Sequence, residues 1–225
     1  MPEDESPAEA PPGEEPQESA TEVKQERLEA ENGFRGEANE RELQELVANL
    51  STNILIIGAG GAGNNTLERL YRGGIDSVEM LALNTDAQHL LAARVPHRML
   101  IGKQLTKGLG AGAEPHLGEG AAEEARDDLL NACHEADIVF LTGGLGGGTG
   151  TGALPVIARF AKEKQALTIA IVTLPFSNEG ARRAKNAQQG LERLRKVADT
   201  VIVIPNDKLL QKDIAQLPLN EAFRK

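Results

Sequence analysis

Residues 137–152 read DIVFLTGGLGGGTGTG, and this stretch decides how the chain folds. It begins with an apolar segment of buried-strand length, and seven of the ten residues from Gly143 to Gly152 are glycine. Glycine is unfavourable in ordered structure unless the backbone takes a positive φ or approaches another group closely, and it leaves amide N–H groups uncovered. Because the apolar run 153–157 follows, we interpret the stretch as strand, turn and helix start, which together cradle a phosphate. The alternative is a flexible linker, but linkers do not lie between a buried strand and a helix.

Two further glycine loops also follow predicted strands. Gly58, Gly60 and Gly63 fit the G-x-G-x-x-G pattern between a strand and a helix, which does not separate a dinucleotide from a mononucleotide. The loop 105–115 is the third. Three such loops exceed what a dinucleotide requires and indicate a longer phosphate chain. The sequence has no G-x-x-x-x-G-K-[ST] motif, so backbone amides, helix dipoles and a divalent cation would hold the phosphates.

The pattern of apolar runs predicts an α/β fold. Helical periodicity alternates with six short apolar runs, at 53–57, 78–83, 98–101, 137–141, 166–173 and 200–204. This alternation indicates a Rossmann-like parallel sheet flanked by helices. The segment 118–133 reads as a single amphipathic helix. Ligands of such sheets bind at the carboxyl ends of the strands.

Three charged side chains follow predicted strands. Asp86 is placed either to accept a hydrogen bond from a ribose hydroxyl or to cap the next helix, and we weigh the two roles equally. Glu179 and Arg183 lie four residues apart on the first turn of a predicted helix, so they share a face. We expect them to point at the site; an ordinary surface ion pair is the alternative.

The acidic charge is confined to the beginning of the chain. Residues 1–50 carry fifteen Asp and Glu against four Lys and Arg, whereas residues 51–225 carry nineteen against twenty. The second part is nearly neutral and gives no indication of a nucleic-acid or membrane-surface partner. Cys133 is the one cysteine, which excludes an intrachain disulfide, and we expect it to be buried. Without a signal sequence or an apolar run of 18 residues, the sequence indicates a cytoplasmic setting.

These patterns divide the chain into three parts. Residues 1–38 are predicted to be a disordered acidic tail, serving as a solvated spacer or, less favoured, a docking peptide. Residues 39–50 are predicted to form a short amphipathic helix packed on the domain, and residues 51–225 form that domain.

Several motifs of the domain occur in one order: Gly58–Asn65, Asn84–Gln88, Thr106–Gly112, Gly146–Gly152, Pro175–Gly180 and Ile204–Leu209. Together they resemble the GTP-binding half of the FtsZ-like, tubulin-related cell-division GTPases, in a form closest to archaeal members. The resemblance covers residues 51–225, and its G-G-G-T-G-T-G element is highly specific. It implies GTP or GDP with Mg²⁺ as the ligand, while the metal ligands remain unknown.

The motifs and the resemblance predict one nucleotide site, made of Gly60, Gly61, Ala62, Gly63, Asn64, Asn65, Asp86, Ala111, Gly112, Gly147, Gly148, Thr149, Gly150, Thr151, Glu179, Arg183, Asn206 and Phe223. The resemblance places 61–65 at the α- and β-phosphates and 148–150 at the β- and γ-phosphates. It places Ala111 and Gly112 near the γ-phosphate, Glu179 at the ribose, and Arg183 and Asn206 at the ribose and base.

The resemblance also implies a cellular role. Family members polymerise head to tail into a division ring at mid-cell and hydrolyse GTP where acids of the next subunit position the attacking water. If the acidic tail is a docking peptide, its partners would be a membrane tether or other division proteins; neither nucleic acid nor direct membrane insertion is expected. The chain stops at Lys225, early in the family's central helix, so we expect no catalytic residue in it and almost no hydrolysis by it alone.

Two other functions stay open at this point. A GTP-binding cytoskeletal regulator that does not cycle would carry the same motifs in this part of the chain. An NAD-dependent oxidoreductase of Rossmann type is supported by Gly58, Gly60, Gly63 and Asp86. That function does not explain why the chain contains the glycine loop 143–152.

Overall fold

The computed structural model describes residues 40, 42–43, 52–75 and 77–210. The chain divides into two units, residues 1–51 and 52–225. In the first unit Glu40, Glu42 and Leu43 are helical. The predicted acidic tail and most of the predicted helix 39–50 lie outside the described residues, as does Phe223.

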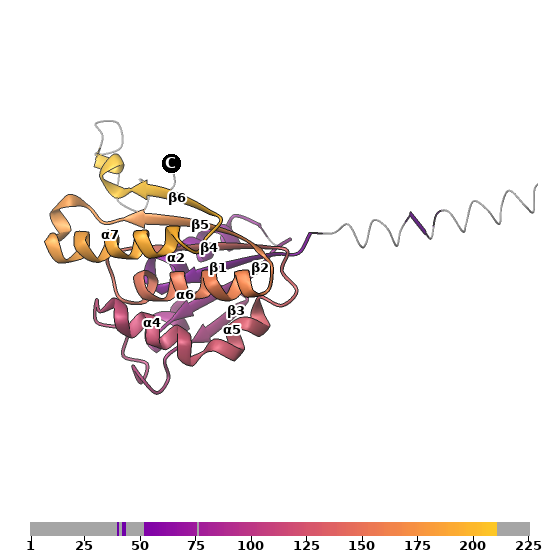
Figure 1. Cartoon of the computed structure of the whole chain (residues 1–225), viewed down its shortest axis with the longest axis horizontal. Helices are drawn as coiled ribbons and strands as arrows, with labels where there is room; N and C mark the ends of the chain where they lie inside the picture. Colours follow the sequence, from indigo (N-terminus) through magenta and orange to yellow (C-terminus); the bar gives the residue numbers. More distant parts are fainter. Residues whose placement is uncertain (1–39, 41, 44–51, 76, 211–225) are drawn as a thin grey trace, which may run out of the picture. The chain divides into compact units, whose positions relative to one another are not determined.

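The second unit is built on one parallel sheet whose strands follow the order β3-β2-β1-β4-β5-β6 (Figure 1). The strands are β1 (Ile54–Ala59), β2 (Glu79–Asn84), β3 (His97–Leu100), β4 (Ile138–Gly144), β5 (Leu167–Leu174) and β6 (Thr200–Pro205). All six predicted strands are confirmed. In the pairing of β1 with β4, Ala59 lies opposite Gly143, so the glycine loops that follow these two strands start at the same level of the sheet.

Helices cover both faces of the sheet. They are α2 (Gly60–Arg72), α3 (Ala87–Ala92), α4 (Pro115–Glu124), α5 (Arg126–Ala132), α6 (Thr149–Glu163) and α7 (Ala181–Arg195), with short 3-10 turns η1 (Ser177–Glu179) and η2 (Asn206–Leu210). Figure 1 shows α4, α5, α6 and α7 on the near face, where they contact one another. The larger core lies beneath them around Phe160, Ile157 and Leu141. Helices α2 and α3 enclose a smaller core around Leu67 and Met80 on the other face.

Cys133 lies in the larger core, as predicted, and is fully buried. Burial raises the pKa of its thiol to about 11, because the charged thiolate is poorly solvated there. The thiol is therefore protonated at neutral pH, and it serves as a small apolar group. In the described part of the chain, no helix is both long and apolar enough to cross a membrane.

The prediction of one helix over 118–133 is wrong. The backbone leaves helical geometry at Ala125, with φ −93° and ψ 21°, and this residue separates α4 from α5. Asp127 and Asp128 occupy the first turn of α5, where acidic side chains favour a helix start. The carboxylate of Glu124, the last residue of α4, accepts the amides of the preceding loop at positions 104 and 105 and so fixes this end of the helix to that loop. Both helices bury the same face, so the apolar periodicity runs across the break.

Helix α6 packs unusually closely on α4. A Cβ atom on Gly152 would lie 2.0 Å from the carbonyl oxygen of Pro115 and 2.5 Å from the amide nitrogen of Glu119. No side chain fits between two backbones at that separation. The last glycine of the central loop therefore serves helix packing, and it fixes the direction in which α6 leaves the sheet.

One part of the sheet is less covered than the rest. On the face that carries α2 and α3, Ile202 and Ile204 of β6 are 47% and 43% exposed. Ile169 and Ile171 of the neighbouring β5 are half-buried, while the alternate residues of both strands pack into the larger core. Among the described residues, no helix covers this apolar strip.

Candidate functional site

A cleft of about 400 Å³ lies at the carboxyl edge of the sheet. Its lining consists of Ala59, Gly60, Gly61, Ala62, Gly144, Leu145, Gly147, Gly148, Thr149, Gly150, Thr173, Pro175, Phe176, Glu179, Arg183 and Asn206. The cleft opens where β1 and β4 end side by side, which is the point where the strand order reverses. Open α/β sheets bind their ligands at this point.

Two helices direct their amino ends into the cleft. Helix α2 begins at Gly60 and α6 at Thr149, and both residues line the cleft. Neither helix has an acidic residue in its first turn or a side chain that caps its amino end. The first N–H groups of a helix need acceptors, and the helix dipole makes an anion the favoured one. The arrangement is therefore suited to a phosphate chain that contacts both helices.

Hydrogen bonds on the side away from the cleft fix the turn between β4 and α6. Gly146 has φ +106°, which excludes most other residues, and its amide donates to the hydroxyl of the buried Thr151 at 2.8 Å. Leu145 donates its amide to the carbonyl oxygen of Thr173 on β5 at 2.9 Å. These bonds fix the turn from the protein side. Among the described residues, none has an atom within 4 Å of a Cβ on Gly147, so the cleft side of the turn is open to a ligand.

A chain of threonines joins the loops that follow β2, β3 and β4. The hydroxyls of Thr149 and Thr85 lie 2.7 Å apart, and both residues are buried. The hydroxyl of Thr106 donates to the carbonyl oxygen of Thr85 at 3.2 Å, and the amide of Gly110 donates to the same oxygen at 3.0 Å. Hydrogen bonds within the protein thus connect the loops after β2, β3 and β4.

The other end of the cleft carries its charged side chains. The carboxylate of Glu179 accepts the amide of Phe176 at 2.8 Å through Oε1 and forms an ion pair with Arg183 through Oε2. Glu179 and Arg183 thus form an i,i+4 pair and also line the cleft. Both features that the sequence suggested are present together. Each carboxylate oxygen keeps a lone pair for a ligand hydroxyl.

Asn206 supplies an acceptor that the protein leaves unused. Its side-chain oxygen Oδ1 is buried, lies in the lining of the cleft, and has no hydrogen-bond donor among the described residues. A buried acceptor without a donor is unfavourable, so this atom indicates a ligand that donates an N–H or O–H group. The neighbouring Asp207 is fixed by the hydroxyl and amide of Ser177, and these bonds hold the pKa of the Asp207 carboxyl below its ordinary value.

Comparison with known proteins decides the family. Residues 53–213 match the family described as Tubulin/FtsZ family, GTPase domain. The chain belongs to the tubulin/FtsZ family. A Rossmann-type oxidoreductase is accordingly not favoured.

Relatives in this family are closely similar in sequence. The cell division protein FtsZ 1 of Archaeoglobus fulgidus is 53% identical over 201 residues, which are 89% of this chain and 54% of the relative. The cell division protein FtsZ of Methanothermobacter thermautotrophicus is 53% identical over 184 residues, covering 82% of this chain and 48% of the relative. The chain therefore spans about half the length of the curated relatives that it matches.

Solved structures share the fold. An empty FtsZ dimer from M. jannaschii has a TM-score of 0.76 at 48% identity, over 83% of this chain and 54% of that one. CetZ2 from Haloferax volcanii, solved as a GTPγS-bound protofilament, has a TM-score of 0.67 at 28% identity, over 77% and 54% of the two chains. The predicted α/β class, a parallel sheet flanked by helices, is the tubulin/FtsZ GTPase architecture.

The structure brings most of the predicted site residues of this tubulin/FtsZ domain together, but not all. Ten of them line the cleft: Gly60, Gly61, Ala62, Gly147, Gly148, Thr149, Gly150, Glu179, Arg183 and Asn206. Those outside its lining are Gly63, Asn64, Asn65, Asp86, Ala111, Gly112 and Thr151. Some of the latter have a clear structural task. Gly63 permits helix packing, because its Cβ would lie 2.5 Å from the carbonyl oxygen of Thr142.

Asn64 and Asp86 also make their contacts within the protein. In the amide orientation that satisfies its surroundings, Asn64 donates to the carbonyl oxygens of Gly58 and Leu83 at 2.9 and 3.1 Å, and it is buried. Asp86 caps α3, with its carboxylate accepting the amide of His89 at 2.9 Å. The cap is one of the two roles that the sequence left open for Asp86.

Six lining residues were missed by the sequence prediction: Ala59, Gly144, Leu145, Thr173, Pro175 and Phe176. The end of a strand is a detectable signal, and it would have found Ala59, Gly144 and Thr173, which lie at or near the carboxyl ends of β1, β4 and β5. Leu145 has no such signal, because a leucine inside a glycine loop does not indicate whether its side chain lines a cleft or packs in the core.

The cleft provides little for a metal ion by itself. Among the described residues, no group of three or more His, Cys, Asp and Glu side chains is placed to hold a metal. Glu179 is the one carboxylate in the lining, and it is engaged by Arg183. A magnesium ion would fit here as a companion of bound phosphates, which would supply the oxygen ligands that the lining lacks.

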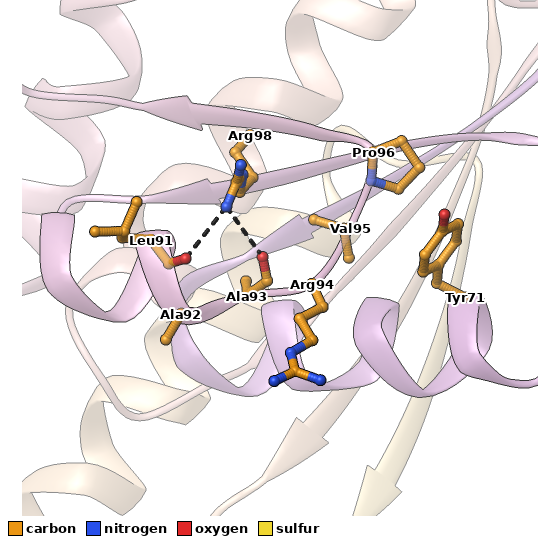
Figure 2. Close-up of a pocket in the computed structure, with 8 residues that line it drawn as sticks. All are labelled: Tyr71, Leu91, Ala92, Ala93, Arg94, Val95, Pro96 and Arg98. Carbon is orange, nitrogen blue, oxygen red and sulfur yellow. Dashed lines mark hydrogen bonds between the residues drawn. The ribbon is translucent and has the colours of Figure 1, made fainter.

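A second hollow, of about 500 Å³, lies at the opposite, amino edge of the sheet (Figure 2). Side chains rather than glycine amides line it, including Tyr71 near the end of α2 and Leu91 on α3. Figure 2 shows the guanidinium of Arg98 directed at the end of α3, where it donates to the carbonyl oxygens of Leu91 and Ala93 at 3.2 and 3.4 Å. The guanidinium of Arg98 thus already serves the helix end, and Arg94, the other charged residue of the lining, extends from the segment between α3 and β3.

Proposed function

We propose that the cleft binds GTP or GDP and that this chain is the nucleotide-binding part of a cell-division GTPase. In this proposal the protein polymerises head to tail, and GTP is hydrolysed at the contact between subunits with acids that lie in the part of the relatives this chain does not span. The chain alone then binds nucleotide and hydrolyses it negligibly. Relatives named as cell division proteins, and a relative solved as a GTPγS-bound protofilament, support the proposal.

The observation that carries this proposal is the set of unused hydrogen-bonding groups in one cleft. Uncapped amino ends of α2 and α6 provide donors, and Oδ1 of Asn206 at the other end provides an acceptor. A nucleotide has the complementary layout, with anionic phosphates at one end and N–H donors on the guanine at the other. In this pose the phosphates contact the backbone of 60–62 and 147–150, while the ribose and base contact Glu179, Arg183 and Asn206.

Magnesium belongs to the proposal as a partner of the phosphates. Mg²⁺ commonly keeps several waters and binds through phosphate oxygens together with one or two protein oxygens. Thr149 is the proposed protein contact, and bound Mg²⁺ would offset the negative charge of the triphosphate. Removal of the metal with a chelator is then expected to weaken binding of GTP more than binding of GDP.

The domain boundaries and partners are further parts of the proposal. We assign 51–225 to the nucleotide-binding domain, 39–50 to a short helix, and 1–38 to an acidic tail that binds a membrane tether or other division proteins. The protein acts in the cytoplasm at the mid-cell division site. The near-neutral charge of 51–225 supports a role without nucleic acid.

The deciding experiment identifies the nucleotide that the purified chain carries. The protein is denatured, and the released small molecules are separated by HPLC and identified by mass spectrometry. We expect GDP or GTP, and a titration with added GTP and Mg²⁺ is expected to saturate if the protein is purified empty. Failure to bind any guanine nucleotide, or saturable micromolar binding of NADH in its place, would falsify the proposal.

A further inference from the structure

The side chain of Thr149 lies between the amino ends of the two helices that reach the cleft. Thr149 is the first residue of α6 and lines the cleft. A Cβ on Gly60, the first residue of α2, would lie 3.4 Å from the Cβ of Thr149 and 3.2 Å from the amide nitrogen of Gly150. Thr149 is therefore placed where we propose that both helix ends contact a phosphate chain, and the direction of its hydroxyl matters to a ligand there.

One side chain of the protein directs the hydroxyl of Thr149. The Oγ1 atoms of Thr149 and Thr85 lie 2.7 Å apart, and among the described residues each of these hydroxyls has the other as its one hydrogen-bond partner. A threonine in a helix can adopt more than one rotamer, so a partner at this distance selects one of them. Thr85 is 0% exposed and lies outside the lining of the cleft, so it cannot contact a ligand there itself.

The backbone around Thr85 is fixed on both sides. The carbonyl oxygen of Thr85 accepts the hydroxyl of Thr106 at 3.2 Å and the amide of Gly110 at 3.0 Å. The amide of the next residue, Asp86, donates to Oδ1 of Asn84 at 3.2 Å. Because these bonds restrain the backbone, the hydroxyl of Thr85 has a defined position.

The hydrogen bond between the two threonines leaves Thr149 able to bind a ligand. A hydroxyl group has one proton to donate and two lone pairs to accept with. If Thr85 is the donor, the proton of Thr149 is left for a phosphate oxygen. If Thr149 is the donor, one of its lone pairs is left for a cation that accompanies the phosphates. In both cases, loss of the Thr85 hydroxyl removes the partner of Thr149 and leaves the group that faces the ligand in place.

We propose that Thr85 is a positioning residue, whose buried hydroxyl holds the hydroxyl of Thr149 toward the phosphates of a bound guanine nucleotide. Thr85 contributes to binding through Thr149 and by no other route. This inference rests on the proposed binding of guanine nucleotides in the cleft. If Thr85 had only a structural role, its loss would lower the affinity whether or not Thr149 kept its hydroxyl.

A double-mutant cycle tests this dependence, with the whole 225-residue chain, freed of bound nucleotide, titrated with GDP and Mg²⁺ by isothermal titration calorimetry. Thr85→Val removes the hydroxyl at nearly constant volume, and it is expected to raise the Kd about two- to tenfold, the usual range for one hydrogen bond. Thr149→Val is expected to raise the Kd at least as much. The double variant is expected to bind within about twofold of Thr149→Val alone, because the group that Thr85 positions is already absent.

Two further variants complete the test. Thr85→Ser keeps the hydroxyl and is expected to bind GDP within about twofold of wild type. Thr168→Val is the matched control, since Thr168 is also fully buried, and its hydroxyl donates to the carbonyl oxygen of Ala166 at 3.2 Å on the amino side of β5. This control is expected to lose stability as Thr85→Val does, with an unchanged Kd.

Two outcomes overturn the inference: wild-type affinity of Thr85→Val, or losses of Thr85→Val and Thr149→Val that multiply in the double variant. Should Thr85→Val fail to fold, Thr85→Ala takes its place in the cycle with the same expectation. A wild-type chain that binds no guanine nucleotide refutes the proposed function itself, and with it this inference.

Discussion

At the amino edge of the sheet, side chains of the protein form hydrogen bonds with the backbone groups of strands and helices. At the carboxyl edge, comparable backbone groups have no such side-chain partner among the described residues. The carboxylate of Asp137 accepts the amide of Asn53 at 2.8 Å, and that of Asp199 accepts the amide of Thr168 at 2.9 Å. At the carboxyl edge, none of the described residues caps the start of α2 or α6 with its side chain, and none donates to Oδ1 of Asn206.

The volume of a hollow does not decide which of the two edges binds a ligand. The hollow at the amino edge has about 500 Å³ and the cleft about 400 Å³. The two edges differ in whether the protein satisfies its own hydrogen-bonding groups. If this distinction is correct, substitutions at the carboxyl edge change ligand binding, and substitutions at the amino edge change stability alone.

The largest effect is expected from Gly148→Ala, which changes both properties. Its Cβ would overlap Ala111, so the turn 111–114 must move away from the cleft. Overpacking of this kind costs about 1–3 kcal/mol of stability. Thermal unfolding and a guanine-nucleotide titration measure the two losses. Wild-type stability together with wild-type affinity would contradict the described packing.

Gly147→Ala separates binding from folding. A Cβ at this position meets no protein atom within 4 Å, so the free energy of unfolding is expected to stay within about 0.5 kcal/mol of wild type. The same methyl group occupies space that we assign to a phosphate. The Kd for GTP is expected to rise at least about tenfold, which corresponds to about 1.4 kcal/mol. Unchanged affinity would show that no ligand approaches this part of the turn.

Asn206→Ala removes the unused acceptor. The Kd for GTP is expected to rise about two- to tenfold, as for the loss of one hydrogen bond. Stability of the ligand-free chain should stay the same or increase, because a buried oxygen without a partner is removed. Differential scanning calorimetry without nucleotide and titration with nucleotide give the two values. Lys208→Ala, an exposed change two residues further on, serves as the control.

Asp199→Asn tests the amino edge through pH. The ammonium group of Lys162, and then the amide of Thr168, hold the pKa of the Asp199 carboxyl below its ordinary value. A lowered pKa stabilises the folded state above the ordinary carboxyl pKa of about 4, and this stabilisation is lost as the pH falls through the lowered pKa. The variant is therefore expected to lose about 0.5–1 kcal/mol at pH 7 and progressively less below pH 4.

Urea unfolding of Asp199→Asn and wild type at several pH values measures this difference, and nucleotide affinity at pH 7 should be equal in the two proteins. A stability difference that grows as the pH falls would have the wrong sign for this explanation. A loss of affinity would show that the two edges are not independent.

The smallest effect is expected from Leu91→Ser in the second hollow. Leu91 is 77% exposed, so a polar side chain replaces surface already in contact with water. Stability is expected to change by less than about 0.5 kcal/mol, with nucleotide affinity unchanged. A clear drop in affinity, measured by the same titration, would give the amino edge a role in binding that the comparison denies.

The strands could be predicted from the sequence because a parallel sheet covered on both faces requires continuous apolar runs. The break between α4 and α5 could not. Ala121 and Leu129 lie on the two sides of Ala125 and enter the same core, so the helical periodicity continues where the helix does not.

The candidate site was predicted in part for a similar reason. A glycine in a loop signals that its backbone lies close to something, but the sequence does not name the neighbour. Gly147 faces open space in the cleft, Gly152 faces the backbone of α4, and Gly63 faces the carbonyl oxygen of Thr142. The sequence also could not predict that Oδ1 of Asn206 lacks a donor among the described residues, because this depends on which groups the fold brings close to it.

The hydroxyl chain of Thr149, Thr85 and Thr106 has a thermodynamic consequence for capture of a ligand. Because these groups join the loops after β2, β3 and β4 through bonds within the protein, part of the conformational entropy of the loops is lost during folding. A ligand then meets loops that the protein itself already restrains, and less of its contact energy is consumed in ordering them. Affinity in such a preorganised site is limited by the quality of the contacts and not by the flexibility of the chain.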